Sequence, residues 1–190
     1  MGGRLAFDLD GVLYPWHEIM LEQFIVEGRL PVESTVGDLF GHGNYFDKLP
    51  KKVRSEYLRD PSYYFEPVLR EGAWEVISAL KDTWEIFYIT ARYSSVEAVT
   101  RAWTWNMGLP RSPENLYVVN GGNKRAVAQA LGITVFVEDN LKYVEQLWDI
   151  CSVVLLTRPW NEDFEGYTNT RIEHVRIDTL HQLVPLLNGI

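Results

Sequence analysis

Six short runs of apolar residues, rich in β-branched and aromatic side chains, recur along the chain with amphipathic stretches between most of them. Runs this apolar are typical of strands that other elements cover on both faces, as in a parallel sheet. From residue 70 onward they alternate with helical patterns, which predicts a doubly wound, Rossmann-like α/β fold with a parallel sheet. The predicted strands are residues 4–9, 85–90, 116–119, 134–137, 153–156 and 174–177.

The segment between the first predicted strand and Pro67 breaks this alternation, because it shows no strand pattern. Its apolar residues recur at helical spacing instead, as Trp16, Met20 and Phe24 illustrate. We therefore expect a small helical cap, residues 14–70, inserted directly after the first strand. The α/β core domain would then consist of residues 1–13 and 71–190.

Composition excludes several classes of protein. The net charge of −8 disfavours a partner with a phosphate backbone, such as duplex nucleic acid. Cys151 is the only cysteine in the 190 residues, so neither an intrachain disulfide nor a thiolate-rich metal site can form. No stretch approaches the roughly 20 apolar residues that a membrane span requires. We expect a cytoplasmic protein without a membrane partner, and a homodimer is compatible with these features.

Acidic residues follow the first and fourth predicted strands, and ligands bind at such strand ends in open parallel sheets. Asp8 and Asp10 are two residues apart and so point to the same side, while Glu138 and Asp139 end the fourth strand. If the two strands are neighbours, carboxylates about 5 Å apart repel by about 3 kcal/mol per pair at an effective dielectric constant of about 20. A proton, a lysine or a hard divalent cation would offset this repulsion, and oxygen ligands favour Mg²⁺ over zinc.

Two further residues at the same edge could bind a phosphoryl group. Thr90 ends the second predicted strand and offers a hydroxyl donor, and Lys124 opens a predicted helix and offers a cation. Each of these residues also has a simpler interpretation: Thr90 as an ordinary strand residue, Lys124 as an exposed lysine, and Glu138 with Asp139 as a helix cap. The functional interpretation is favoured because these residue types occur together.

A known pattern spans the first strand and the turn after it. An apolar strand followed by Asp-x-Asp-Gly and then Thr or Val resembles the first motif of the haloacid-dehalogenase-like (HAD) phosphohydrolase superfamily. The later motifs of that superfamily occur here in the same order, as Thr90, Lys124 and the pair Glu138-Asp139. Within the superfamily, the chain is most similar to 5′(3′)-deoxyribonucleotidase-like proteins, on the grounds of the small helical cap and a late loop. The matching segments are Leu5-Ala6-Phe7-Asp8-Leu9-Asp10-Gly11-Val12-Leu13 and Thr157-Arg158-Pro159-Trp160-Asn161.

The resemblance implies a role for each motif residue. Asp8 would be the nucleophile, and Asp10 would protonate the leaving group and then activate water. Lys124 would orient Asp8, and Thr90 would bind a phosphate oxygen. The groups that would hold Mg²⁺ are the Asp8 carboxylate, the Asp10 backbone carbonyl, Asp139 and, through water, Glu138.

Asp10 also separates two types of reaction. A halide leaving group needs no proton, and dehalogenases of the superfamily lack a second aspartate at this place, whereas an alkoxide leaving group needs one. We therefore expect hydrolysis of a phosphate monoester through an aspartyl phosphate. The expected substrate is a nucleoside monophosphate, preferentially deoxy.

Candidate substrate-binding residues lie close to the first two motifs. Tyr14 and Trp16 could stack on a base, although packing between cap and core is the simpler interpretation. Arg92 could hold the substrate or lie at a solvated helix start. Three other functions stay open: a phosphatase of another small metabolite such as a sugar phosphate, a 3′-phosphatase acting on nucleic acid ends, and a non-catalytic phosphate-binding module.

Overall fold

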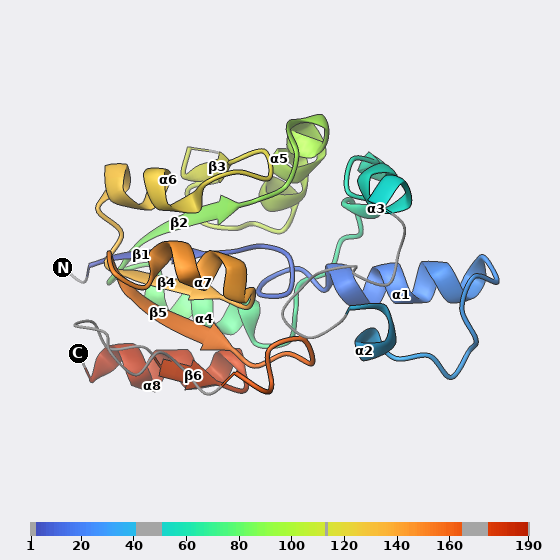
Figure 1. The fold of residues 1–190 in the computed structure, drawn as a ribbon. Helices are drawn as coiled ribbons and strands as arrows, with labels where there is room; N and C mark the ends of the chain where they lie inside the picture. The colour runs from blue at the N-terminus through green and yellow to red at the C-terminus, as the bar shows by residue number, and fades with distance from the viewer. Residues whose placement is uncertain (1–2, 41–50, 113, 165–174, 190) are drawn as a thin grey trace.

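The computed structural model describes residues 3–40, 51–112, 114–164 and 175–189, which form a six-stranded, fully parallel sheet with helices on both faces (Figure 1). The strand order β3-β2-β1-β4-β5-β6 starts at the centre and grows outward in both directions. This order confirms the predicted doubly wound α/β fold. The strands are β1 (Arg4–Phe7), β2 (Glu85–Thr90), β3 (Leu116–Val118), β4 (Val135–Glu138), β5 (Ser152–Leu156) and β6 (Val175–Ile177).

The two central strands, β1 and β4, are hydrogen-bonded neighbours. Phe7 of β1 lies opposite Val137 of β4 on one side and opposite Tyr88 of β2 on the other. Because parallel strands in this register end at the same edge, the residues that follow Phe7 and Val137 come together. The predicted cluster of carboxylates depends on this adjacency.

Five helices of the described chain cover the sheet: α4 (Ala73–Leu80), α5 (Glu97–Asn106), α6 (Lys124–Leu131), α7 (Leu141–Leu147) and α8 (Leu183–Asn188). Side chains alternate along each strand, so each face of the sheet has its own apolar core. Leu5 and Phe7 pack on one face with buried residues of α4, α5 and α8. Ala6 and Phe136 pack on the other face with residues of α6 and α7. The 3₁₀ turns are η1 (Pro61–Tyr63), η2 (Ser94–Val96) and η3 (Leu180–Gln182).

The helices that precede α4 lie together beyond the carboxyl ends of the strands (Figure 1). They are α1 (Trp16–Val26), α2 (Val36–Leu39) and α3 (Lys51–Tyr57). Trp16, Met20 and Phe24 belong to the same apolar cluster as Leu5 and Phe7, so the helical segment packs against the core of the sheet. The position of these helices agrees with an insertion after β1, while its limits at residues 14 and 70 stay a prediction.

β2 spans the predicted residues 85–90, whereas several other strand ends differ from the predicted ones by one or two residues. β1 ends at Phe7 rather than at Leu9, because the Leu9 carbonyl accepts hydrogen bonds from the backbone N–H groups of Leu13 and Tyr14 and so closes a tight turn. β4 ends at Glu138, one residue later than predicted. The first residue of the sixth predicted strand lies outside the described residues.

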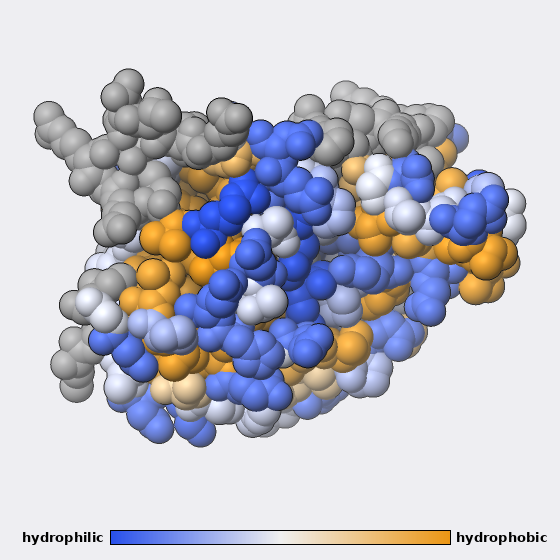
Figure 2. Space-filling model, turned by 90° about the horizontal axis from the view of Figure 1, so that it is seen from below, coloured by the Kyte–Doolittle hydropathy of each residue, from blue (hydrophilic) through white to orange (hydrophobic). Residues whose placement is uncertain are grey.

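The described surface mixes polar and apolar side chains. In the view from below, polar residues cover much of it and apolar residues form separate patches (Figure 2). Exposed large apolar side chains include Val26, Val32 and Trp105. Within the described ranges, no helix combines the length and the apolar character that crossing a membrane requires.

Candidate active site

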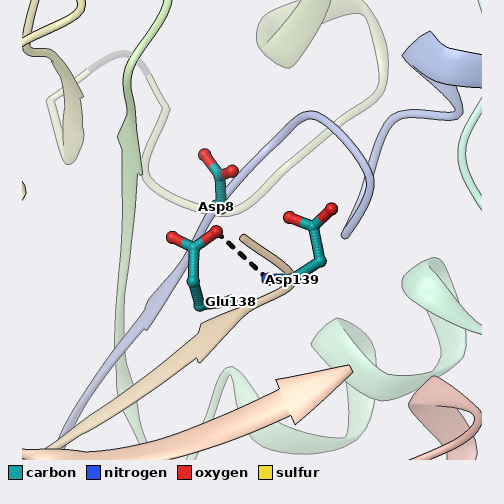
Figure 3. Close-up of side chains that lie close together, drawn as sticks. All are labelled: Asp8, Glu138 and Asp139. Atoms are coloured by element: carbon teal, nitrogen blue, oxygen red, sulfur yellow. Dashed lines mark hydrogen bonds between the residues drawn. The ribbon is translucent and has the colours of Figure 1, made fainter. Parts of the chain in front are cut away.

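Three carboxylates converge at the carboxyl edge of the sheet. Asp8 directly follows β1, Glu138 is the last residue of β4, and Asp139 comes next. An oxygen from each lies within 4.8 Å of the others, and all three residues are buried. Figure 3 shows the carboxyl groups gathered around a common space. The structure therefore brings these residues together, as the sequence predicts for neighbouring strands.

A buried lysine lies between two of these carboxylates. Lys124, the first residue of α6, has its Nζ atom 2.9 Å from Asp8 Oδ1 and 2.7 Å from Glu138 Oε2. Its side chain is completely buried, so the interpretation as an exposed lysine is wrong. Burial disfavours the charged form, but the carboxylates of Asp8 and Glu138 outweigh it and raise the pKa of Lys124 above its ordinary value. The ammonium group thus offsets part of the repulsion within the cluster.

The surroundings of Asp8 disfavour the ionised form of its carboxyl group. Burial raises the pKa of its carboxyl group above the ordinary value, and the Lys124 ammonium lowers that pKa only in part. Glu138 and Asp10 raise the pKa of Asp8 further by repulsion. Lys124 thus offsets only part of the cost of ionising the buried Asp8 carboxyl group, and a metal cation at this place would favour the ionised form.

Glu138 uses both of its oxygen atoms within the protein. Oε2 accepts the hydrogen bond from Lys124, and Oε1 accepts from the backbone N–H groups of Asp139 at 3.1 Å and Asn140 at 3.0 Å. The cap of α7 is Asn140, whose Oδ1 atom accepts from the N–H of Lys142. Glu138 therefore anchors Lys124 and the loop after β4, and contact with a metal through water stays a prediction for it.

Asp10 lies in the tight turn that follows β1. Gly11, the next residue, has φ of +84°, a conformation that residues with a Cβ atom rarely adopt. A Cβ atom at Gly11 would also collide with the Asp139 carboxylate. Glycine is needed here both for the path of the chain and for the close approach of Asp139 to the turn.

A cavity of about 270 Å³ opens beside Asp8 and Asp10. Thr90, the last residue of β2, is buried in its wall, as the sequence predicts for a residue at this edge. Asn140 and Gly121 from two other strand ends also line the cavity. Its aromatic lining residues are Trp16, Tyr64, Tyr93 and Tyr143.

The three candidate substrate-binding residues lie in different surroundings. Trp16 lines the cavity and stacks against Tyr64, with 6.0 Å between the ring centroids. Tyr14 is completely buried, and its hydroxyl donates to the Tyr63 carbonyl at 3.2 Å, which fits the packing interpretation. Arg92 also lines the cavity, but it is buried and donates to Asp10, so the interpretation as a solvated residue is wrong, while contact with substrate stays a prediction.

Comparisons with known proteins find similarity in structure but not in sequence. No protein-family model matches the chain, and no curated protein is significantly similar to it. Solved structures match almost the whole chain, among them a dehalogenase with a TM-score of 0.64, 15% identity, and coverage of 97% of this chain and 96% of the other. A Bacillus subtilis protein assigned as a HAD hydrolase and bound to magnesium has a TM-score of 0.62, 14% identity, and coverage of 99% and 100%. A HAD family hydrolase from Deinococcus radiodurans, with bound phosphate and sodium, has a TM-score of 0.57, 16% identity, and coverage of 98% and 95%.

The chain has the HAD-like fold. Identities this low establish the fold alone, and the matched structures include both hydrolases and a dehalogenase. The likeness to 5′(3′)-deoxyribonucleotidase-like proteins therefore stays a prediction. Which reaction a HAD-like fold carries out depends on the residues in its site.

The loop after β5 adds residues to the candidate site. Trp160 Nε1 donates to Asp139 Oδ2 at 3.1 Å, and Asn161 Nδ2 donates to the Asp139 carbonyl at 2.7 Å. Arg158 Nε donates to the Gly11 carbonyl at 2.9 Å. The loop thus braces both the turn after β1 and the loop after β4. The sequence indicated only that a loop with polar residues follows the fifth strand. The spacing of residues along the chain does not reveal which groups that loop contacts.

The donors of the cluster fit a hard divalent cation. All the candidate ligand atoms are carboxylate oxygens, and among the described residues no histidine or cysteine belongs to the cluster. Mg²⁺ is commonly bound by one or two carboxylates together with water and phosphate oxygens. Asp8 and Asp139 are the better placed of the three, because Glu138 already uses both oxygens. A buried acidic cluster that could bind a metal is thus present at the predicted place.

Proposed function

We propose that this protein is a Mg²⁺-dependent phosphatase that hydrolyses a phosphate monoester through a phosphorylated Asp8. The observation that carries the proposal is the convergence of Asp8, Lys124 and Asp139 in one buried cluster beside a cavity that also reaches Asp10 and Thr90. A nucleophile, a cation that orients it, and a metal-binding carboxylate are what phosphoryl transfer to an aspartate requires.

The first half of the reaction transfers the phosphoryl group to the protein. A carboxylate oxygen of Asp8 attacks phosphorus, the bond between phosphorus and the ester oxygen breaks, and Asp10 donates a proton to that departing oxygen. Lys124 holds the Asp8 carboxylate in place, and the Thr90 hydroxyl donates to an oxygen of the phosphoryl group. Mg²⁺, held by Asp8, Asp139 and the Asp10 carbonyl, would neutralise charge on the phosphoryl oxygens.

The second half restores the enzyme. Asp10, now ionised, takes a proton from a water molecule, whose oxygen attacks phosphorus as the bond to Asp8 breaks. Inorganic phosphate leaves, and Asp10 ends the cycle protonated, ready for the next substrate. Asp10 therefore serves as acid and then as base. This need for a proton donor is why the residue favours a phosphatase over a dehalogenase, whose halide leaves without a proton.

We propose a nucleoside monophosphate, preferentially deoxy, as the substrate, and the aromatic lining of the cavity is compatible with a planar base. The cavity volume of about 270 Å³ lies just below the roughly 300–1,000 Å³ that small-molecule sites occupy. Aromatic rings line the cavity: the half-buried Tyr93 and the more deeply buried Tyr143 on the side of the sheet, and the buried Trp16 from the helical segment. A planar base could stack on such faces while the phosphate lies at Asp8. Sugar phosphates, and 3′-phosphates of nucleic acid ends, are the competing substrates.

Phosphate release from a panel of monophosphates tests the proposal. The panel contains the common ribo- and deoxyribonucleoside 5′- and 3′-monophosphates, sugar phosphates and a 3′-phosphorylated oligonucleotide, each with and without Mg²⁺. We expect Mg²⁺-dependent release from deoxynucleoside monophosphates that disappears in Asp8→Asn. The matched control is Asp149→Asn, since Asp149 pairs with Arg125 at an exposed place away from the cluster. The proposal fails if the wild-type protein releases no phosphate, or if Asp8→Asn remains active.

A further inference from the structure

An ion pair buried beside the cluster links two residues that are 82 positions apart in the chain. Arg92 donates from Nε to both oxygens of Asp10, at 3.1 and 3.0 Å, and from Nη2 to Oδ1 at 2.6 Å. Two neighbouring nitrogen atoms on one carboxylate fix its plane as well as its position. The side chain of Arg92 is 0% exposed and that of Asp10 is 20% exposed, so one side of Asp10 stays accessible.

Aromatic rings surround the guanidinium group of Arg92. Its central carbon lies 4.6 Å from the ring centroid of Tyr64, 5.0 Å from that of Tyr14 and 5.7 Å from that of Trp103. At such distances the face of a ring attracts a cation, and more strongly away from water. These rings come from the turn after β1, the segment before α4, and α5. Elements from three parts of the chain thus hold one cation.

The polar ends of the same three rings are hydrogen-bonded to backbone carbonyls. Tyr14 donates to Tyr63 at 3.2 Å, Tyr64 to Leu58 at 3.1 Å, and Trp103 to Glu66 at 3.0 Å. All three acceptors belong to the segment that returns from α3 to α4. Each ring is therefore held by its own backbone at one end and by a hydrogen bond at the other. The guanidinium group between the rings has little freedom to move.

Each nitrogen of Arg92 already has an acceptor. Nε and Nη2 donate to the Asp10 carboxylate, and Nη1 donates to the hydroxyl of Thr100 at 3.1 Å. A substrate phosphate that displaced Asp10 from the guanidinium group would leave a part-buried carboxylate without its cation, which is unfavourable. The alternative to substrate binding is that Arg92 acts through Asp10.

We propose that Arg92 is a positioning residue that holds the Asp10 carboxylate in the orientation needed for proton transfer, and that the aromatic cage of Tyr14, Tyr64 and Trp103 holds Arg92. This inference rests on the proposed phosphatase function, because it assigns a role within that reaction. Proton transfer requires a heavy-atom distance of about 2.6–3.2 Å, so a carboxylate that rotates freely would meet this requirement less often.

A double-mutant cycle separates positioning from substrate binding. Arg92→Met, Asp10→Asn and the double variant are compared with the wild type in steady-state phosphate release. We expect Arg92→Met to lower kcat by about 10²-fold, the lower end for loss of an acid–base group, with KM changed by less than about threefold. Because Arg92 acts through Asp10, the double variant should be no more than about threefold slower than Asp10→Asn.

Two milder variants keep the test informative if Arg92→Met does not fold. Arg92→Lys retains the charge but loses the paired contact, and we expect its kcat to lie between those of the wild type and Arg92→Met. Thr100→Val removes the acceptor of Nη1 and leaves Asp10 untouched, and should lower kcat by about three- to tenfold. The matched control, Arg101→Met, removes an arginine of α5 that pairs with Glu97 at the surface and should leave kcat unchanged.

The outcomes distinguish this inference from the function on which it rests. An inactive wild type overturns the phosphatase proposal, and the positioning role with it. An active wild type overturns only the positioning role if KM rises while kcat is kept, because Arg92 then contacts substrate. The same conclusion follows if the defects of Arg92→Met and Asp10→Asn multiply in the double variant, or if Arg92→Lys and Thr100→Val both retain full kcat.

Discussion

Trp160 and Asp139 are 21 residues apart in the chain, and the indole nitrogen of Trp160 donates to Oδ2 of Asp139 at 3.1 Å and to the Asp139 carbonyl at 3.2 Å. Both residues are buried. A carboxylate held in this way presents its other oxygen in a restricted direction. Hydrogen bonds of this kind orient metal ligands and raise the affinity of a site for its ion.

Replacing Trp160 by phenylalanine should therefore weaken the binding of Mg²⁺. The aromatic ring would still pack against His17, whose centroid lies 3.9 Å away, but the donor to Asp139 would be lost. We expect the Mg²⁺ concentration for half-maximal phosphate release to rise by about 10- to 100-fold. Trp105→Phe is the control, because Trp105 is 67% exposed. Equal Mg²⁺ requirements in the two variants would contradict the role of Trp160.

Mg²⁺ should stabilise the wild-type protein against heat. Binding to the native carboxylates alone adds about 2.7 kcal/mol at a concentration 100 times the dissociation constant. The melting temperature should thus rise with added Mg²⁺, and Asp139→Asn should abolish most of this rise. Asp149→Asn should leave it intact, since that carboxylate lies at an exposed ion pair. A melting temperature that is unchanged up to millimolar Mg²⁺ would argue against a preformed metal site.

Asp10→Asn should separate metal binding from catalysis. The backbone carbonyl of residue 10 is retained, so the rise of the melting temperature with Mg²⁺ should persist. Turnover should fall by at least about 10²-fold, because the amide can neither donate the proton of a carboxylic acid nor act as its base. Steady-state kinetics and melting curves on the same preparation check both halves. Near-normal turnover would show that another group transfers the proton.

His17→Phe should change how stability depends on pH. His17 is completely buried among aromatic rings, and burial, followed by the charges of Arg70 and Arg158, lowers its pKa well below the ordinary value of about 6.5. As pH falls below about 6.5, His17 becomes protonated in the unfolded chain but stays neutral in the native protein. The free energy of unfolding therefore decreases as pH falls below that value. That loss approaches about 1.4 kcal/mol per pH unit.

Urea unfolding at pH 7.5, 6.5 and 5.5 measures this dependence. The free energy of unfolding should fall more steeply toward pH 5.5 in the wild type than in His17→Phe. If the substitution also changes packing, it shifts the free energy of unfolding by the same amount at every pH. The difference in slope between the two proteins is then unaffected. Parallel curves would mean that His17 accepts its proton equally well in the folded and unfolded chains.

The carboxylate cluster shows why part of the site could be predicted. Asp8 and Asp139 each follow an apolar run, and the ends of parallel strands meet at one edge, so their convergence requires only that β1 and β4 be neighbours. The interpretation of Lys124 rested on the same logic, since it opens the helix after β3. Strand ends were less accurate, because the turn after Phe7 is closed by backbone hydrogen bonds that the pattern of apolar residues does not reveal.

Arg92 illustrates what could not be predicted. Its position after β2 left two interpretations open, a substrate ligand and a solvated residue, and neither indicated the pairing with Asp10 that the structure shows. The rings of Tyr64 and Trp103 that enclose it come from distant parts of the chain. The sequence pattern around Arg92 does not indicate which carboxylate it pairs with or which aromatic rings enclose it.

Local patterns of apolar and polar residues were enough to specify the strands, the helices and the edge at which Asp8 and Asp139 meet, because burial of apolar faces follows the periodicity of each element. Partners such as Arg92 for Asp10, and Trp160 for Asp139, emerge only once the chain is folded. The physical reason is that a hydrogen bond or a buried ion pair depends on the distance between two groups in the folded protein and on their removal from water. Neither can be inferred from the spacing of residues along the chain.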